Sequence, residues 1–228
     1  MTKEQVLAML PEFSNALTAE ERDLFLDNLY VRSLKKNELI YHEGEIPSKL
    51  FCLLSGKVKI YKDGVGGRSQ IVRVMHAVEF FGYRASFSGE PFITAAAAFE
   101  PSVIACVPLT VVKKLILQNA RVAWLFIHQL ASLLGKSDER LVNLTQKHIR
   151  GRLAESILFM KENYGVEADG DTLAIHLSRE DMANLSNMTT SNAIRTLNSF
   201  AREGLIELNG RRIRIVREDE LRRVSRLG

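Results

Sequence analysis

Apolar residues recur with different periodicities along the chain, and each periodicity predicts a different kind of structure. Residues 5–29 carry apolar positions at three- and four-residue steps, as amphipathic helices do. From residue 31 to residue 107 the pattern changes to short apolar runs separated by glycines, which predicts an all-β sandwich, barrel or roll. The expected strands are 38–41, 50–54, 57–61, 70–75, 95–99 and 103–107.

Residues 121–146 contain one glycine and no proline, which predicts a long helix. Its apolar positions follow one another at steps of four and three, close to a heptad repeat. We interpret this seam as the interface of a parallel dimer. The alternative is a helix that lies on the β-domain, which the apolar residues before Leu134 also fit. The residues of the seam are Phe126, Leu130, Leu133, Ser137, Leu141 and Leu144.

Residues 178–204 predict two short helices joined by a sharp turn. Ser178 can cap the first helix, and Thr189 can cap the second. Asn187 tolerates the left-handed conformation that a sharp turn requires, and Gly204 is a typical helix end. This pattern indicates a helix-turn-helix, whereas a helical pair that only packs is the alternative. The inward face of the second helix is expected to hold Ala193, Ile194, Leu197 and Ala201.

The segments around the helix pair complete a third unit. Asn209 and Gly210 separate the apolar runs 205–208 and 212–216, a strong signal for a β-hairpin. A helix-turn-helix followed by a hairpin is a winged helix. A helix over residues 149–163 and a strand over residues 172–177 are expected before it.

Charge changes the picture because it is unevenly distributed. The chain carries 31 basic and 27 acidic residues, a net charge of +4, and residues 195–228 alone hold nine arginines against five acids. Arginine suits phosphates and base edges. If the second helix enters a major groove, the base-edge candidates at its start are Thr190, Ser191, Asn192 and Arg195. The phosphate and positioning candidates around it are Ser178, Arg179, Thr189, Arg211 and Arg212.

Other function classes find little support in the residues. His42 and His76 are isolated, and the sequence contains no zinc, serine-nucleophile or P-loop motif, so we do not expect an enzyme. Cys52 and Cys106 cannot form a disulfide framework or a four-thiolate cluster alone. Without a long apolar run or a secretory signal, we expect a cytoplasmic protein without a membrane partner.

From about residue 10 to residue 220, the chain resembles the CRP/FNR superfamily of bacterial transcription regulators. The resemblance implies an α+β fold with a β-roll effector domain over residues 1–120, a dimerisation helix over residues 121–146 and a winged helix-turn-helix over residues 147–228. It also implies a homodimer that binds a pseudo-palindromic DNA operator, with RNA polymerase as a further partner. The matching elements are Gly44, 51–58, Phe81-Gly82, Gly151-Arg152-Leu153-Ala154, Thr189, Arg195, Leu197 and Gly204-Leu205-Ile206.

The resemblance also places an effector pocket in the β-roll, coupled to the dimer helix, but several of its residues depart from the family pattern. Members that bind cyclic AMP carry Glu where Tyr83 stands here, and an Arg-Ser or Arg-Thr pair at Phe92-Ile93 or Ile93-Thr94. A buried phosphate without a cation is costly, so we do not expect cyclic-AMP binding. The tentative pocket residues are Phe81, Gly82, Tyr83, Arg84, Phe92, Ile93, Thr94, Ser137 and Asp138.

The effector is therefore unknown at this stage, and several alternatives stay open. Arg84 could supply a charge from another position. Haem could use His76 or Met75 as an axial ligand, as in redox- or nitric-oxide-sensing relatives, and a pocket that binds nothing is an alternative equal to haem. Most relatives carry Glu where this chain has Ser191, so its operator should differ from the common one. An alternative of another class is a dimeric sensor or adaptor that binds a ligand or protein without DNA readout.

Overall fold

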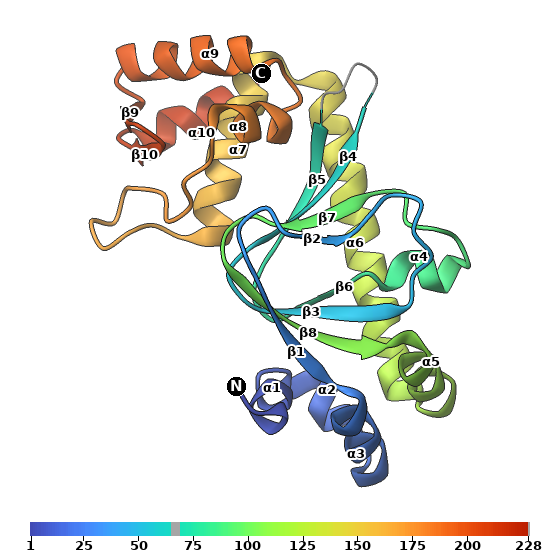
Figure 1. Cartoon of the computed structure of the whole chain (residues 1–228). Coiled ribbons are helices and arrows are strands. Elements are labelled where there is room, and N and C mark those ends of the chain that lie inside the picture. Colours follow the sequence, from blue (N-terminus) through green and yellow to red (C-terminus); the bar gives the residue numbers. More distant parts are fainter. Residues whose placement is uncertain (65–68, 228) are drawn as a thin grey trace. The chain divides into compact units, whose positions relative to one another are not determined.

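The computed structural model describes residues 1–64 and 69–227, and it divides the chain into two compact units (Figure 1). The first unit comprises Met1–Asp63 and Val72–Gly135, and the second comprises Gly64–Ile71 and Lys136–Gly228. In the described part of the chain, no helix is long and apolar enough to cross a membrane.

The first unit begins with helices, as the sequence predicts, but they are short. They are α1 (Lys3–Ala8), α2 (Pro11–Ala16) and α3 (Ala19–Asn28). The helical run is interrupted because new starts are encoded within it: Pro11 occupies the first turn of α2, and Thr18 caps α3 through a capping box with Glu21. These helices bury Val6, Phe13 and Phe25.

Two four-stranded sheets form the β-roll of this unit, in the orders β1-β8-β3-β6 and β2-β7-β4-β5. The six expected strands are confirmed. Two more were not expected, because β1 carries polar Arg32 and Ser33 and β6 has three residues only. The strands are β1 (Tyr30–Leu34), β2 (Leu39–Tyr41), β3 (Lys49–Ser55), β4 (Val58–Asp63), β5 (Ser69–Met75), β6 (Glu79–Phe81), β7 (Ala95–Ala98) and β8 (Ser102–Pro108).

Three helices complete the first unit: α4 (Tyr83–Ser88), α5 (Leu109–Gln118) and the start of α6 (Ala120–Gln146). The first turns of α6 bury Val122 and Phe126 in the core formed by the N-terminal helices, β3 and β8. The Phe126 ring lies 5.1 Å from the Tyr83 ring and 5.5 Å from the Phe87 ring. Phe126 therefore belongs to the core of its own unit, and its assignment to a dimer seam is corrected.

The second unit contains the expected winged helix. Its elements are α7 (Ile149–Tyr164), α8 (Arg179–Leu185), α9 (Thr190–Arg202), β9 (Ile206–Asn209), β10 (Arg212–Ile215) and α10 (Glu218–Leu227). The strand expected at 172–177 is wrong, because Thr172 and Leu173 form only isolated bridges, with Arg214 and Val166. Helix α10 was not expected; it packs on α7 (Figure 1), buries Leu221 and pairs Glu218 with Lys161.

Candidate nucleic-acid interface

The two helices α8 and α9 begin and end where their capping residues stand. The Ser178 hydroxyl accepts from the Asp181 amide at 3.0 Å and donates to the Asp181 carboxylate at 2.6 Å. Asn187 has a φ of 49° in the turn, and the Thr189 hydroxyl accepts from the Asn192 amide at 3.2 Å. These interactions confirm the predicted helix-turn-helix and show that Ser178 and Thr189 are used as caps.

Two arginines donate hydrogen bonds to backbone carbonyl oxygens at the end of α8 and in the turn before α9. Arg152 on α7 donates to the carbonyl oxygens of Ser186 at 3.0 Å and Asn187 at 3.1 Å. Arg140 on α6 donates to the carbonyl of Leu185 at 3.2 Å, and burial lowers the pKa of its guanidinium. Helix ends leave carbonyl groups without partners, which cations satisfy. Sequence reasoning missed both roles because the partners lie 34 and 45 residues away.

Helix α9 has one buried face and one exposed face. Ala193, Leu197 and Phe200 are buried at steps of four and three, together with Thr196. The expected inward position of Ile194 is wrong: this side chain is 41% exposed. Each helical residue turns by about 100°, so Ile194 leaves the buried stripe that begins at Ala193.

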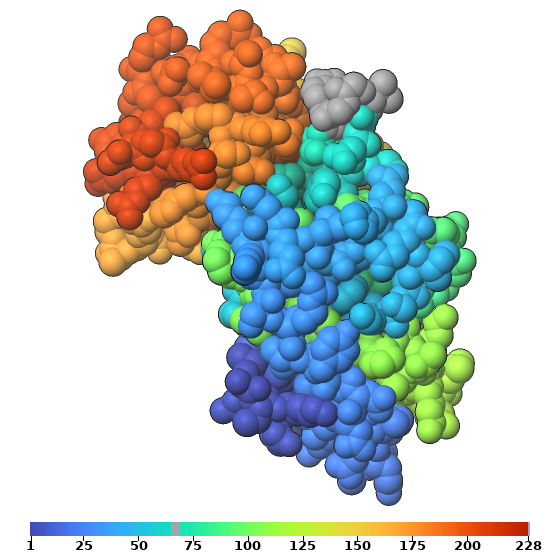
Figure 2. Space-filling view, in the orientation of Figure 1, coloured from blue at the N-terminus to red at the C-terminus, as the bar shows by residue number. Residues whose placement is uncertain are grey.

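The exposed face of α9 carries polar and cationic groups along a shallow hollow. Residues of α9 form part of the surface of the second unit (Figure 2). Thr190 and Ser191 are exposed at the start of the helix, and Arg195 donates to the Asn192 side chain at 2.8 Å. Sequence reasoning did not select Asn198 and Arg202, although both follow Arg195 at helical steps on this face. The hollow is lined by Ser191, Ile194, Arg195, Asn198, Ala201 and Arg202.

The predicted phosphate ligands divide into two groups in the structure. Arg179 donates to the carbonyl of Gly210 at 2.7 Å, so it holds the turn between β9 and β10. Arg211 is exposed on that same turn. Arg212 is exposed at the start of β10 and lies 3.5 Å from the Glu167 carboxylate. The wing arginines are thus presented at the surface, whereas Arg179 positions them.

The C-terminal end of α9 is tied to α7 by a paired contact. Arg150 donates to both Glu203 carboxylate oxygens, at 2.8 and 2.7 Å, and its guanidinium lies 4.9 Å from the centre of the Phe200 ring. Arg150, together with the Ser199 hydroxyl, lowers the pKa of Glu203 to about 2. This contact fixes the far end of α9, and nothing in the local sequence signals it.

The predicted effector-pocket residues lie in several different environments in the structure. Phe81 and Phe92 are buried in the β-roll interior, where Phe92 stacks on Tyr41 with ring centres 3.8 Å apart and Phe81 stacks on Phe51 at 5.2 Å. Gly82 has a φ of 83°, and a Cβ there would lie 2.7 Å from the Phe51 ring. The aromatic rings therefore occupy much of the interior themselves.

The other predicted pocket residues lie elsewhere. Tyr83 is buried beside Phe126; burial raises its pKa to about 12, and its hydroxyl has no hydrogen-bond partner among the described residues. Arg84 and Ile93 are exposed, and Thr94 is half-buried and shares a hydrogen bond with the Tyr41 hydroxyl. Ser137 and Asp138 are exposed on α6 and belong to the second unit.

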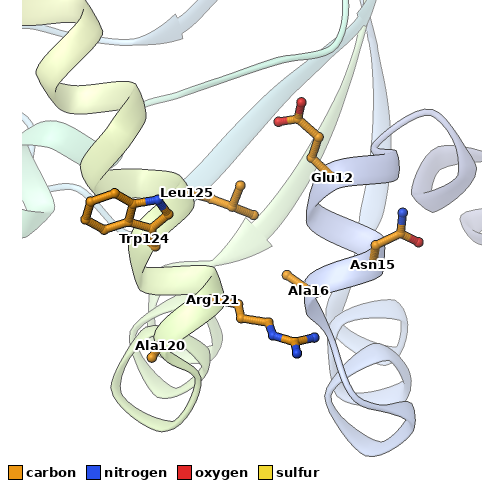
Figure 3. Close-up of a pocket in the computed structure, with 7 residues that line it drawn as sticks. All are labelled: Glu12, Asn15, Ala16, Ala120, Arg121, Trp124 and Leu125. Carbon is orange, nitrogen blue, oxygen red and sulfur yellow. The ribbon is translucent and has the colours of Figure 1, made fainter.

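A separate groove of about 450 Å³ lies between α2 and the start of α6 in the first unit (Figure 3). Helix α2 contributes Glu12 and Asn15, and α6 contributes Arg121, Trp124 and Leu125. None of these residues was predicted to bind an effector, and Trp124 is 65% exposed at its rim.

Comparison with known proteins defines the class of both units. Residues 31–119 match the cyclic nucleotide-binding domain, and residues 151–224 match the Crp-like helix-turn-helix domain. The protein thus combines a β-roll of the cyclic nucleotide-binding domain family with a Crp-like helix-turn-helix domain. The chain belongs to the CRP/FNR family of DNA-binding transcription regulators, and the predicted resemblance is confirmed.

Relatives and solved structures span nearly the whole chain. The CRP-like cAMP-activated global transcriptional regulator of Mycobacterium tuberculosis is 24% identical over 84% of this chain and 86% of its own. Electron transport regulator A of Shewanella oneidensis is 26% identical over 90% and 82%. The structure of FixK2 from Bradyrhizobium japonicum covers 86% of this chain and 97% of its own, with a TM-score of 0.77 at 23% identity.

Proposed function

We propose that this protein acts as a homodimer that binds a pseudo-palindromic DNA operator in a sequence-specific manner. The observation that carries the proposal is the exposed face of α9, on which Thr190, Ser191, Asn192 and Arg195 stand above a buried apolar stripe. A helix of this kind fits a major groove with its N-terminal residues at base edges. Two copies would bind half-sites about one helical turn, roughly 34–36 Å, apart.

The charges around α9 support a duplex as the partner. Arg195 and Arg202 are exposed on α9, and Arg211 and Arg212 are exposed on the wing. Arg214 is neutralised within the unit, since it lies 3.2 Å from Asp171. The exposed arginines of α9 and the wing would contact the phosphates, which would make binding strongly dependent on salt. Action on DNA favours a cytoplasmic location.

A second copy of the chain is proposed to cover the exposed apolar face of α6. Trp124, Ile127, Leu134 and Leu141 are 65%, 53%, 64% and 63% exposed, and their positions follow a heptad register. Ala131, exposed Asp138 and exposed Thr145 fill the alternate positions. Of the seam expected from the sequence, this face keeps Leu141 alone. Phe126 lies in the core of the first unit, Leu130 packs against that core, Leu133 and Leu144 are half-buried, and Ser137 is exposed.

The dimer proposal is tested by charge substitution on that face. Leu134→Glu should give a monomer by sedimentation equilibrium, because a carboxylate would be buried at the centre of the seam. Leu117→Glu is the matched control, since Leu117 is 86% exposed and belongs to α5 and not to α6. A dimeric Leu134→Glu protein would contradict the proposed interface.

For the effector, we propose a response that does not depend on cyclic AMP. Tyr83 stands at the position expected for a ribose-binding Glu, and the rings of Phe81 and Phe92 are packed in the interior. The relative from Mycobacterium tuberculosis is described as cAMP-activated, so cyclic-AMP binding by the two proteins can be compared directly. Calorimetry with cyclic AMP, cyclic GMP and haemin tests this part, and tight cyclic-AMP binding would contradict it.

A haem-dependent response is the alternative proposal for the effector. Of the two haem-ligand candidates, Met75 is fully buried in the β-roll core, whereas His76 is half-buried. We propose that any effector acts by shifting α6 and thereby the spacing of the two copies of α9, a population shift between two arrangements. Contact with RNA polymerase remains part of this proposal.

The DNA-binding proposal is tested by mobility shift with a duplex that the wild-type protein selects from a randomised library. Arg195→Ala should weaken specific binding by at least about 30-fold, because one bidentate guanine contact is lost in each half-site. Arg223→Ala, which removes the same charge from an exposed position on α10, should change affinity little. Unchanged specific binding by a dimeric Arg195→Ala protein would contradict groove reading.

A further inference from the structure

Helix α9 exposes a large aliphatic side chain within its polar face. Ile194 is 41% exposed, and within α9 no other large apolar side chain of the described residues is as exposed. A single exposed apolar residue is common at protein surfaces and carries no meaning alone. The position of Ile194 is informative, however, because this side chain lines the same hollow as Ser191, Arg195 and Asn198.

These four side chains lie on one face, since residues three and four apart on a helix are neighbours. Whatever contacts Ser191 and Arg195 together therefore also contacts Ile194. The partner proposed for this face is the major groove of a duplex, toward which Arg195 and Arg202 direct positive charge. An isoleucine side chain can neither donate nor accept a hydrogen bond, so it cannot contribute to readout through the polar groups of a base.

The major-groove edge of DNA offers one apolar group, the C5-methyl group of thymine. We propose that Ile194 contacts this methyl group and makes thymine the preferred base beside the base pair that Arg195 contacts. The inference rests on the proposed function, because it requires α9 to enter the major groove. It assigns to Ile194 a specificity-determining role that the inward orientation expected from the sequence would not allow.

The test removes only the methyl group. In the duplex selected by the wild-type protein, each thymine is replaced in turn by deoxyuridine in both half-sites, which leaves base pairing and polar edges unchanged. Burial of one methyl group corresponds to about fourfold in affinity, so replacement in both half-sites should weaken wild-type binding about 16-fold at the contacted position. Ile194→Ser should bind the thymine and deoxyuridine duplexes equally well, and Ile194→Val should keep most of the discrimination.

The control variant is Ile46→Ser, which removes a 69% exposed isoleucine from the first unit and should retain the wild-type response to deoxyuridine. The inference is overturned if the selected duplex binds through Arg195 but no thymine replacement weakens binding. It is also overturned if Ile194→Ser discriminates as strongly as the wild-type protein. If the wild-type protein selects no sequence at all, the proposed function fails together with the inference.

Discussion

In α9 the residues predicted to bind a partner keep their polar groups at the surface, whereas in the β-roll the predicted pocket residues Phe81 and Phe92 pack against neighbouring rings. Arg195 donates to its helix neighbour Asn192 at 2.8 Å, and Phe92 lies 3.8 Å from Tyr41, ring centre to ring centre. The side chains of α9 are therefore available to a ligand, whereas the rings of the β-roll contribute to packing of the core. The structure thus leaves the polar side chains of α9 exposed and packs the predicted pocket rings into the core of the first unit.

The strongest test of this comparison is the removal of a ring from the β-roll. Phe92→Ala should lower the free energy of unfolding by about 3–5 kcal/mol, because a buried ring is lost and a cavity remains. The measurement is urea denaturation followed by circular dichroism. Ile93→Ala, at a neighbouring side chain that is 48% exposed, should change stability little. A loss below about 1 kcal/mol for Phe92→Ala would indicate an interior that already has room for a ligand.

The next largest loss of stability is expected from a substitution that affects the turn before α9. Arg152→Ala leaves the carbonyls of Ser186 and Asn187 without their charged donor, so the free energy of unfolding should fall by about 2–3 kcal/mol. DNA affinity should fall as well, since the turn sets the direction of α9. Arg223→Ala is again the matched charge control. If the Arg152→Ala and Arg223→Ala proteins have the same free energy of unfolding, the turn does not depend on the guanidinium of Arg152.

Sequence reasoning succeeded where structure is encoded locally. The caps at Ser178 and Thr189 and the left-handed Asn187 each depend on neighbours within a few residues, and all were predicted. The hairpin of β9 and β10 was predicted as well, but its loop is Gly210-Arg211 and not Asn209-Gly210, because Asn209 pairs with Arg212 in the strands. Sequence reasoning failed where two faces of one helix are both apolar, as with Phe126 on α6. Periodicity shows that a face exists but does not show what covers it.

Long-range contacts set a second limit on prediction. Arg152 donates to carbonyl oxygens that lie 34 and 35 residues further along the chain, and Arg150 donates to Glu203, 53 residues away. No local sequence pattern signals contacts at these separations. The effector pocket shows the same limit: the departures at Tyr83 and Phe92 were visible in the sequence, but the stacking that fills the interior depends on Tyr41 and Phe51 from other strands.

A smaller loss of stability tests whether the N-terminal cap of α9 at Thr189 contributes to the fold. Thr189→Ala removes the acceptor for the Asn192 amide and should cost about 1 kcal/mol of stability, while Thr189→Ser should retain it. Thr190→Ala, one residue further along, caps nothing and should leave the melting curve unchanged. Equal melting of the Thr189→Ala and Thr190→Ala proteins would show that packing alone fixes the start of α9.

The smallest effect distinguishes a packed interior from a ligand site at Tyr83. Its buried hydroxyl has no partner among the described residues, whereas the Tyr41 hydroxyl shares a hydrogen bond with Thr94. Tyr83→Phe should therefore be neutral or stabilise the fold by up to about 1 kcal/mol, while Tyr41→Phe should destabilise it by about 1 kcal/mol. Thermal melts of the two variants measure the difference. A destabilised Tyr83→Phe protein would mean that this hydroxyl is satisfied in solution, by water or by a bound molecule in the space beside Phe126.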